Sequence, residues 1–242
     1  MIRTLSVVLV VLISCYLVFA AFFFYGEGRD KDCVGIQIVV KDSLDKHFVN
    51  ETDVISILKK SSLNPKGLKM SEINTHKIEK ALLKNEMIRS VEVYKTPSAR
   101  IKMNVIQKIP ILRVLNNTGS YYIDNEGDFM PMSYRYVVHV PIVTGYAKKE
   151  YVKEKLYKFA LFLQNDDFWN NQIDQIYIRS DNEIVLIPRV GQCQIILGEI
   201  DDFEGKLHNL KLFYEQAIPI MGWNRYKTVN LKFKNQIVCT KK

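Results

Sequence analysis

The feature that most constrains this chain is an uncharged, apolar segment close to its start. Residues 5–25 read LSVVLVVLISCYLVFAAFFFY and contain no charged side chain. A helix of this length can cross the hydrocarbon layer of a bilayer, which is about 30 Å thick. Arg3 and the terminal amine precede the segment and favour a short cytoplasmic tail at residues 1–4. The sequence therefore predicts a transmembrane helix at residues 5–25, a linker at residues 26–33 and a large C-terminal part outside the membrane.

Two other interpretations of the apolar segment stay open. A cleaved signal peptide would end at residues 18–20, and the mature chain would then begin with the apolar sequence AFFFYG. Residues 12–15 also resemble a bacterial lipoprotein box in which Cys15 is lipidated. A lipoprotein normally continues with a polar tether, whereas here the apolar run continues beyond Cys15 to Tyr25. An uncleaved anchor fits the segment best.

Charge and cysteine patterns argue against nucleic-acid and metal binding. The formal net charge is +8, but Lys and Arg are scattered through segments of mixed charge. A nucleic-acid site would gather them on one element together with stacking aromatic residues. A solvated basic face is the ordinary interpretation, and attraction to an anionic membrane or an acidic partner is the alternative. The four cysteines show neither CxxC spacing nor a histidine at zinc-ligand spacing, so we expect no metal and no cofactor.

Residues 34–109 show the periodicities of a small α+β domain. An apolar strand pattern precedes two amphipathic helices, whose starts are marked by Asn50, with Asp53 three residues later, and by Asn74. Two alternating segments then flank a turn at residues 96–99, which is the pattern of a β-hairpin. The order β-α-α-β-β predicts two helices packed on one face of a three-stranded sheet.

Residues 110–242 predict a second, β-rich α+β domain with a largely antiparallel sheet and two helices. Short apolar runs separated by turn residues indicate the strands, and Gly127 supplies a positive φ in one of the hairpins. The helices are expected at about residues 152–163 and 202–217, each with apolar residues at helical spacing.

The last predicted strand lies almost at the end of the chain. Val229, Leu231 and Phe233 alternate with polar neighbours, which is the period of a half-buried strand. A strand at this place leaves unpaired backbone groups, so it is a candidate edge for pairing with another protein. The predicted partner-binding residues are Thr228, Val229, Asn230, Leu231, Lys232, Phe233, Lys234, Asn235, Gln236, Ile237, Val238 and Cys239.

The sequence contains none of the common catalytic motifs. It has no GxSxG, no P-loop, no GxGxxG after a strand and no HExxH, and its four histidines are isolated from one another. The acidic pairs Asp166-Asp167 and Asp201-Asp202 each precede a helical or aromatic segment, where an N-cap is the ordinary use of an aspartate. We therefore expect no enzymatic activity and no small-molecule substrate.

Several short motifs follow one another along both units. The segment Asn85-Glu86-Met87-Ile88 joins the second helix to the hairpin of the first unit, and the hairpin runs into Gln107-Lys108-Ile109-Pro110. With these motifs the first unit resembles a POTRA domain. The second unit adds Asp124-x-x-Gly127, Val140-Pro141-Ile142-Val143-Thr144-Gly145, Ile195-Ile196-Leu197-Gly198 and Val229-Asn230-Leu231-Lys232-Phe233. With both units, the chain resembles the FtsQ/DivIB family of bacterial cell-division proteins, most closely its Bacteroidetes branch.

The chain departs from the family pattern at a few positions. The family usually has Asn-Pro where this chain has Asn85-Glu86, and Pro-x-Gly where it has Pro97-Ser98-Ala99. Lys232 and Phe233 occupy the positions of an Arg-Tyr pair that contacts FtsB in the family. Lys keeps the charge without the bidentate fork, and Phe keeps the ring without the hydroxyl.

The resemblance implies a non-catalytic, single-pass scaffold of the divisome at the septum. Its N-terminus would lie in the cytoplasm and its bulk in the periplasm, anchored in the inner membrane. The POTRA domain would meet other divisome components, and the β domain would capture the FtsB/FtsL pair by strand addition to help control septal peptidoglycan synthesis. The alternatives are a POTRA-containing component of envelope assembly or protein export, and a membrane-tethered envelope enzyme.

Overall fold

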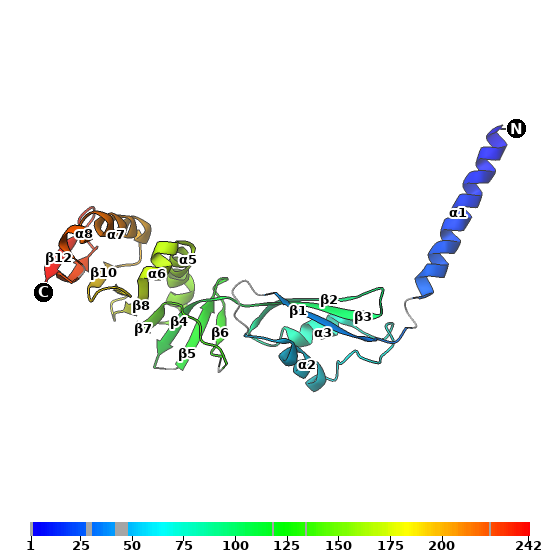
Figure 1. Cartoon of the computed structure of the whole chain (residues 1–242), viewed down its shortest axis with the longest axis horizontal. Coiled ribbons are helices and arrows are strands. Elements are labelled where there is room, and N and C mark those ends of the chain that lie inside the picture. Colours follow the sequence, from blue (N-terminus) through cyan, green and yellow to red (C-terminus); the bar gives the residue numbers. More distant parts are fainter. Residues whose placement is uncertain (1, 28–30, 42–47, 118, 134, 223) are drawn as a thin grey trace. The chain divides into compact units, whose positions relative to one another are not determined.

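A computed structural model describes residues 2–27, 31–41, 48–117, 119–133, 135–222 and 224–242 (Figure 1). Within the first helix, side chains are described for residues 9–21. Contacts divide the chain into two compact units, residues 1–107 and residues 108–242. Each unit has its own sheet, and each is treated by itself below.

The first helix, α1 (Ile2–Glu27), contains the apolar segment. From Leu9 to Phe19 the large apolar side chains are exposed. Nowhere among the residues with described side chains is there a helix with both the length and the apolarity needed to span a bilayer. The predicted transmembrane segment at residues 5–25 lies partly outside those residues, and it stays a prediction.

The first unit contains a three-stranded sheet with two helices on one face, as Figure 1 shows. The central strand β3 pairs in parallel with β1 and antiparallel with β2. The predicted order β-α-α-β-β is confirmed. The elements are β1 (Gly35–Lys41), α2 (Glu51–Lys60), α3 (Thr75–Leu82), β2 (Ile88–Lys95) and β3 (Arg100–Gln107).

Local sequence signals account for the limits of these helices. The Asn50 side chain accepts a hydrogen bond from the Asp53 amide at 2.9 Å, and the Asp53 carboxylate accepts one from the Asn50 amide at 3.1 Å. This reciprocal pair is the predicted capping box of α2. The Asn74 side chain caps α3 by accepting from the Lys77 amide at 3.0 Å. In the hairpin, Ala99 has the left-handed φ of 53° that a glycine usually takes in such a turn.

The second unit is a nine-stranded sheet in the order β12-β11-β10-β9-β8-β7-β4-β5-β6. Its helices lie on one side of the strands (Figure 1). One apolar core, which includes Leu156, Phe159, Leu207 and Leu210 of the helices, joins them to the sheet. The elements are β4 (Pro110–Asn116), β5 (Gly119–Asp124), β6 (Phe129–Pro131), β7 (Ile142–Gly145), α4 (Lys149–Tyr151), the π-helical turn η1 (Val152–Leu156), α5 (Tyr157–Asn165), α6 (Asp167–Gln172), β8 (Ile173–Ile178), β9 (Ile184–Pro188), β10 (Gln194–Gly198), α7 (Phe203–Gln216), α8 (Ile218–Met221), β11 (Tyr226–Asn230) and β12 (Val238–Lys241).

The sheet of the second unit is largely antiparallel, as predicted, but it also contains parallel pairs that the sequence did not reveal. Five strand pairs are antiparallel, but β4–β7, β7–β8 and β10–β11 are parallel. The cause lies in the connections, because parallel neighbours need a long crossover. The helices from α4 to α6 join β7 to β8, and α7 and α8 join β10 to β11. The two predicted helices are present, and the short helices α6 and α8 accompany them in the described chain.

The predicted terminal strand is corrected, because residues 228–239 form a hairpin and not one strand. β11 ends at Asn230, whose side chain accepts a hydrogen bond from the Lys232 amide at 3.0 Å. Such an Asx turn reverses the chain. Asn235, with a φ of 58°, completes the loop before β12 begins at Val238. Alternation alone does not reveal this break, since Leu231 is still buried after β11 ends.

Of the two aspartates expected to cap helices, one does so. Asp166 accepts hydrogen bonds from the Phe168 and Trp169 amides at 2.9 and 3.1 Å and caps α6. Asp202 precedes α7 with a left-handed φ of 54°, and its side chain makes no capping hydrogen bond. The expectation is wrong at Asp202: its backbone is left-handed and not extended as at Asp166, and its carboxylate lies beside Gly205 in the first turn of α7 without accepting a capping hydrogen bond.

We predict that Gly145→Ala strongly destabilises the second unit. Gly145 has a φ of +86°, and an added Cβ would overlap the Ile178 carbonyl oxygen and lie 3.0 Å from the Tyr177 ring. Strain of this kind costs about 1–3 kcal/mol even without an overlap. Gly119→Ala is the matched control, because Gly119 also has a positive φ but has no neighbour within 4 Å of the added Cβ. Hydrogen exchange of the β7 and β8 amides should report a loss about 2 kcal/mol larger for Gly145→Ala. Equal losses would contradict this account.

Candidate functional site

The second unit ends in a strand with one open side. β12 is the last strand of the nine-stranded sheet and pairs with β11. Just beyond it, the Lys242 amide donates to the Arg225 carbonyl oxygen at 3.2 Å. Successive backbone amides of a strand point to opposite sides. The N–H and C=O groups of Lys241 and Cys239 therefore point away from β11, toward the open side of the sheet.

The hairpin is held to the sheet through β11. Val229 lies opposite Ile195 of β10 on one side and opposite Cys239 of β12 on the other. Its side chain is buried in the core of the unit. Beyond the end of the strand, the Leu231 amide donates to the Ile196 carbonyl oxygen at 2.9 Å and extends the pairing with β10. β11 is thus an internal strand, and β12 is the exposed one.

The opposite end of the same sheet is blunted. β6 is three residues long and ends at Pro131, which has no amide hydrogen to donate. The Lys108 ammonium donates to the Phe129 carbonyl oxygen at 3.3 Å, and the ammonium groups of Lys149 and Lys153 lie over the Phe129 ring. A short edge with proline and lysine is one that proteins protect against pairing.

The edges of the three-stranded sheet are also partly covered. On β2, the Val93 amide donates to the Glu79 carboxylate of α3 at 2.9 Å. Two residues before β1, the Cys33 amide donates to the Leu68 carbonyl oxygen at 2.8 Å, and the Gly67 amide donates to the Cys33 carbonyl oxygen at 3.0 Å. These contacts occupy outward-facing backbone groups. Among the described edges, β12 is the one that lies at the predicted partner-binding residues, and it is therefore the candidate edge for a further strand.

The predicted partner-binding residues divide among three environments. Thr228, Val229 and Asn230 belong to β11, residues 231–237 form the loop, and Val238 and Cys239 begin β12. The side chains of Val229 and Leu231 are buried and unavailable to a partner. Sequence reasoning missed Thr240 and Lys241, which continue β12 beyond the predicted range. The alternation of Val238 and Thr240 with Cys239 was the signal for them.

The two side chains expected to contact a partner are placed differently. Phe233 is 52% exposed on the loop between β11 and β12. Lys232 reaches back across the sheet, and its ammonium forms an ion pair with Glu183 at the start of β9. Phe233 is therefore free to contact another protein, whereas Lys232 is already engaged within the domain.

A groove lies between α7 and the loop that precedes β12. Its volume is about 400 Å³. Its lining includes the charged residues Lys206, Lys232, Lys234 and Asp202. The Lys206 ammonium donates to the Glu199 carbonyl oxygen at 2.6 Å. Burial lowers the pKa of Lys206, and the neighbouring carboxylates of Asp202, Glu199 and Asp201 oppose that shift. The remaining lining residues are Gly205, His208, Asn209, Leu231, Phe233, Asn235, Gln236 and Ile237.

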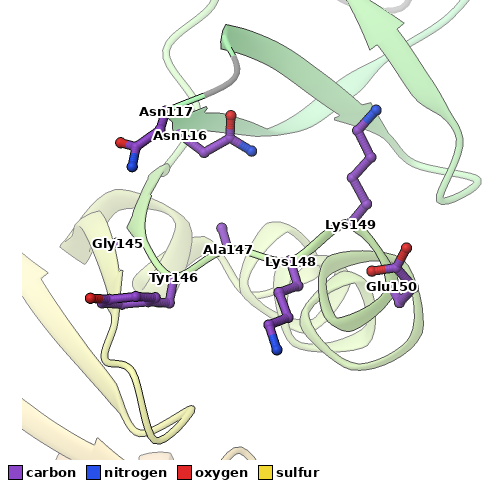
Figure 2. Close-up of a pocket in the computed structure, with 8 residues that line it drawn as sticks. All are labelled: Asn116, Asn117, Gly145, Tyr146, Ala147, Lys148, Lys149 and Glu150. Carbon is purple, nitrogen blue, oxygen red and sulfur yellow. The ribbon is translucent and has the colours of Figure 1, made fainter.

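A second hollow, of about 390 Å³, lies where β7 runs into α4. Figure 2 shows Lys148 and Lys149 projecting from its rim in opposite directions. The Lys149 ammonium lies over the Tyr121 and Phe129 rings, at 5.9 and 5.5 Å from their centroids. The two positive charges therefore do not converge on one point. The described lining residues include no serine, histidine or cysteine: Asn116, Asn117, Gly145, Tyr146, Ala147, Lys148, Lys149 and Glu150.

Thiol chemistry is disfavoured near the hairpin. Burial, together with the nearby Cys239 thiol, raises the pKa of Cys193 to about 11, and burial also raises the pKa of Cys239. Reactive cysteines have the opposite shift, because the thiolate is the nucleophile. Within the described part of the chain, no group of three or more His, Cys, Asp and Glu side chains could hold a metal ion.

Comparison with known proteins agrees with this architecture. Residues 109–240 match the family model described as FtsQ/DivIB, C-terminal related, and residues 31–106 match the model of a POTRA-like domain. A similar protein is the Cell division protein FtsQ of Rhodothermus marinus, which is 25% identical over 187 residues. The alignment covers 71% of this chain and 67% of that relative. These matches confirm the resemblance inferred from the sequence motifs.

Proposed function

Since residues 109–240 match its model, the chain belongs to the FtsQ/DivIB, C-terminal related family, and we propose that it is a non-catalytic scaffold of bacterial cell division. In this proposal an FtsB/FtsL-type pair adds a strand to β12 and thereby links the scaffold to septal peptidoglycan synthesis. The observation that carries the proposal is the open side of β12, where the backbone groups of Cys239 and Lys241 face outward.

Strand addition suits this edge energetically only if other contacts contribute. A net hydrogen bond between backbones stabilises a complex by about 1 kcal/mol. Two outward-facing residues supply a few such bonds, which the loss of translational and rotational freedom on binding largely offsets. The exposed Phe233 and the groove beside α7 lie next to the start of β12 and would supply the remaining affinity and the selectivity.

The charge of the hairpin supports a partner other than a second copy of the chain. Residues 218–242 contain no acidic side chain and carry Arg225, Lys227, Lys232, Lys234, Lys241 and Lys242. Two such edges placed side by side would bring like charges together, which is destabilising. The basic surface would instead favour a neutral or acidic strand.

The proposal includes a membrane anchor and a second binding unit. α1 has large apolar side chains exposed from Leu9 to Phe19, which suits burial in lipid. We place its N-terminus in the cytoplasm and the two folded units in the periplasm, at the inner membrane of the septum. The POTRA-like unit would meet other divisome components. No cofactor, nucleic acid or small-molecule substrate enters this proposal.

Lys241→Pro is predicted to weaken capture of the FtsB/FtsL-type pair at least tenfold. Proline removes the outward-facing amide hydrogen, and its ring obstructs the incoming strand. The fold should survive, because proline is tolerated on an edge strand where its nitrogen faces solvent. Affinity is measured by pull-down of the pair with the full-length chain in detergent.

Lys241→Ala is the matched control, because it removes the same charge and keeps the amide hydrogen. It should bind within about threefold of the unchanged protein, as expected for an exposed charge. Hydrogen exchange of the β11 amides verifies that both variants are folded. If the proline variant binds as tightly as the alanine variant, strand addition at β12 is wrong.

A fluorescent fusion to the full-length chain should form a ring at midcell during constriction. This outcome follows from recruitment by other division proteins through the POTRA-like unit. It is scored by time-lapse microscopy in cells that express the fusion at native level. A uniform envelope signal that persists through constriction would favour the alternative, a component of envelope assembly or protein export.

A further inference from the structure

The Lys232 side chain lies in the loop between β11 and β12 but is bound to a residue on another hairpin. Its ammonium pairs with the Glu183 carboxylate, which is 49 residues away in sequence, at the start of β9. The Glu183 side chain is 16% exposed and that of Lys232 is 43% exposed. The contact therefore links the loop between β11 and β12 to the hairpin of β8 and β9, across the intervening strand β10.

Glu183 is held in place by its own hairpin. Its Oε2 accepts a hydrogen bond from the Arg179 guanidinium at 3.3 Å, and its amide donates to the Asp181 carboxylate at 3.0 Å. Its carbonyl oxygen accepts from the Arg179 amide at 2.9 Å. The Glu183 carboxylate is therefore held in place by contacts that do not involve Lys232. The ion pair restrains the lysine side chain, and the glutamate does not depend on it for its position.

The path of the lysine stem depends on a glycine. Gly198, at the end of β10, has a φ of +75°, and an added Cβ would lie 2.7 Å from Lys232 Cγ and 3.3 Å from its Cδ. The backbone at the base of the lysine is fixed as well. The Lys232 amide donates to Asn230 Oδ1 at 3.0 Å, and the preceding amide, of Leu231, donates to Ile196 O at 2.9 Å.

We propose that Glu183 is a positioning residue for the C-terminal hairpin. It anchors Lys232 over Gly198, and this anchor fixes the loop at residues 231–237 and the point at which β12 begins. Lys232 then supports partner capture by ordering the edge and not by touching the partner. This inference rests on the proposed strand addition to β12, and it adds Glu183 as the residue that holds the edge strand in position for a partner.

The physical reason is that a loop restrained at one point loses less freedom when a partner binds. Ordering a flexible segment on association costs about 0.5–1.5 kcal/mol for each immobilised side chain. An anchor that already restrains Lys232 and its neighbours removes part of that cost. A direct contact of Lys232 with an acidic partner would require the ammonium to leave Glu183, which would then lie half-buried without its lysine.

The first test uses the full-length chain without any partner. Glu183→Gln should make the amides of residues 232–240 exchange roughly five- to tenfold faster, which is the effect expected from the loss of one half-buried ion pair. Gly198→Ala should have the same effect, because it displaces the lysine stem. Asp174→Asn is the control: Asp174 pairs with Arg189 at 3.6 Å on the same sheet, away from the hairpin, and its loss should leave these amides unchanged. Unchanged exchange in Glu183→Gln would overturn the inference.

The second test is a charge exchange, measured by capture of the FtsB/FtsL-type pair in an Arg179→Gln background, which removes the guanidinium that would repel a lysine at position 183. Glu183→Lys and Lys232→Glu should each weaken capture about tenfold, and the double variant should recover most of the loss, because the anchor is restored with reversed charges. If Lys232 touches an acidic partner directly, the double variant stays as weak as Lys232→Glu. That result would overturn the positioning role alone. Unimpaired capture by Lys241→Pro would instead overturn strand addition, whatever the charge exchange shows.

Discussion

The C-terminal edge of this protein depends on the parallel pairing of β10 with β11. That pairing requires the helical crossover through α7 and α8, because parallel neighbours cannot be joined by a tight turn. Once β11 is bound on one side to β10 and its Val229 is buried in the core, the chain that follows can only fold back onto the remaining side. β12 is consequently an edge strand of this sheet, and no described strand pairs with its outer side.

An open edge is a liability unless the rest of the molecule limits where pairing can occur. β6 is short and ends in Pro131, and the Glu79 carboxylate occupies the Val93 amide on β2. Each of these two features blocks strand pairing with a single side chain. Among the described residues no comparable contact covers β12, and its protection comes from charge, because Lys241 and Lys242 lie on the strand and just beyond it. Charge repels a second copy of the chain without excluding a partner of different charge.

Local signals in the sequence were sufficient to predict the helix starts and several turns. The pairing of strands that are distant in sequence could not be predicted from such signals. Asn50, Asn74 and Asp166 act within a few residues of themselves, so their capping roles could be predicted from spacing. Two of the parallel pairs, β7–β8 and β10–β11, join strands separated by helices, and the third, β4–β7, joins strands separated by β5 and β6. No periodicity within a strand specifies its neighbour. The prediction of one continuous strand at residues 228–239 was wrong because alternation of buried residues does not show where a strand ends. Burial of Leu231 extends the alternation past Asn230, where the Asx turn has already ended the strand.

The structure gives a physical role to residues of the family motifs that the motifs alone do not explain. Gly145 is required because a side chain there would overlap the Ile178 carbonyl oxygen, and Gly198 is the surface over which the Lys232 stem passes. Lysine lacks the planar fork of arginine, but a single carboxylate held by Arg179 needs only a point charge. The replacement of arginine by lysine at this position is therefore compatible with an internal anchor and less suited to bidentate recognition of a partner. A short edge strand gains most from such an anchor, because few backbone hydrogen bonds are available to offset the cost of ordering it.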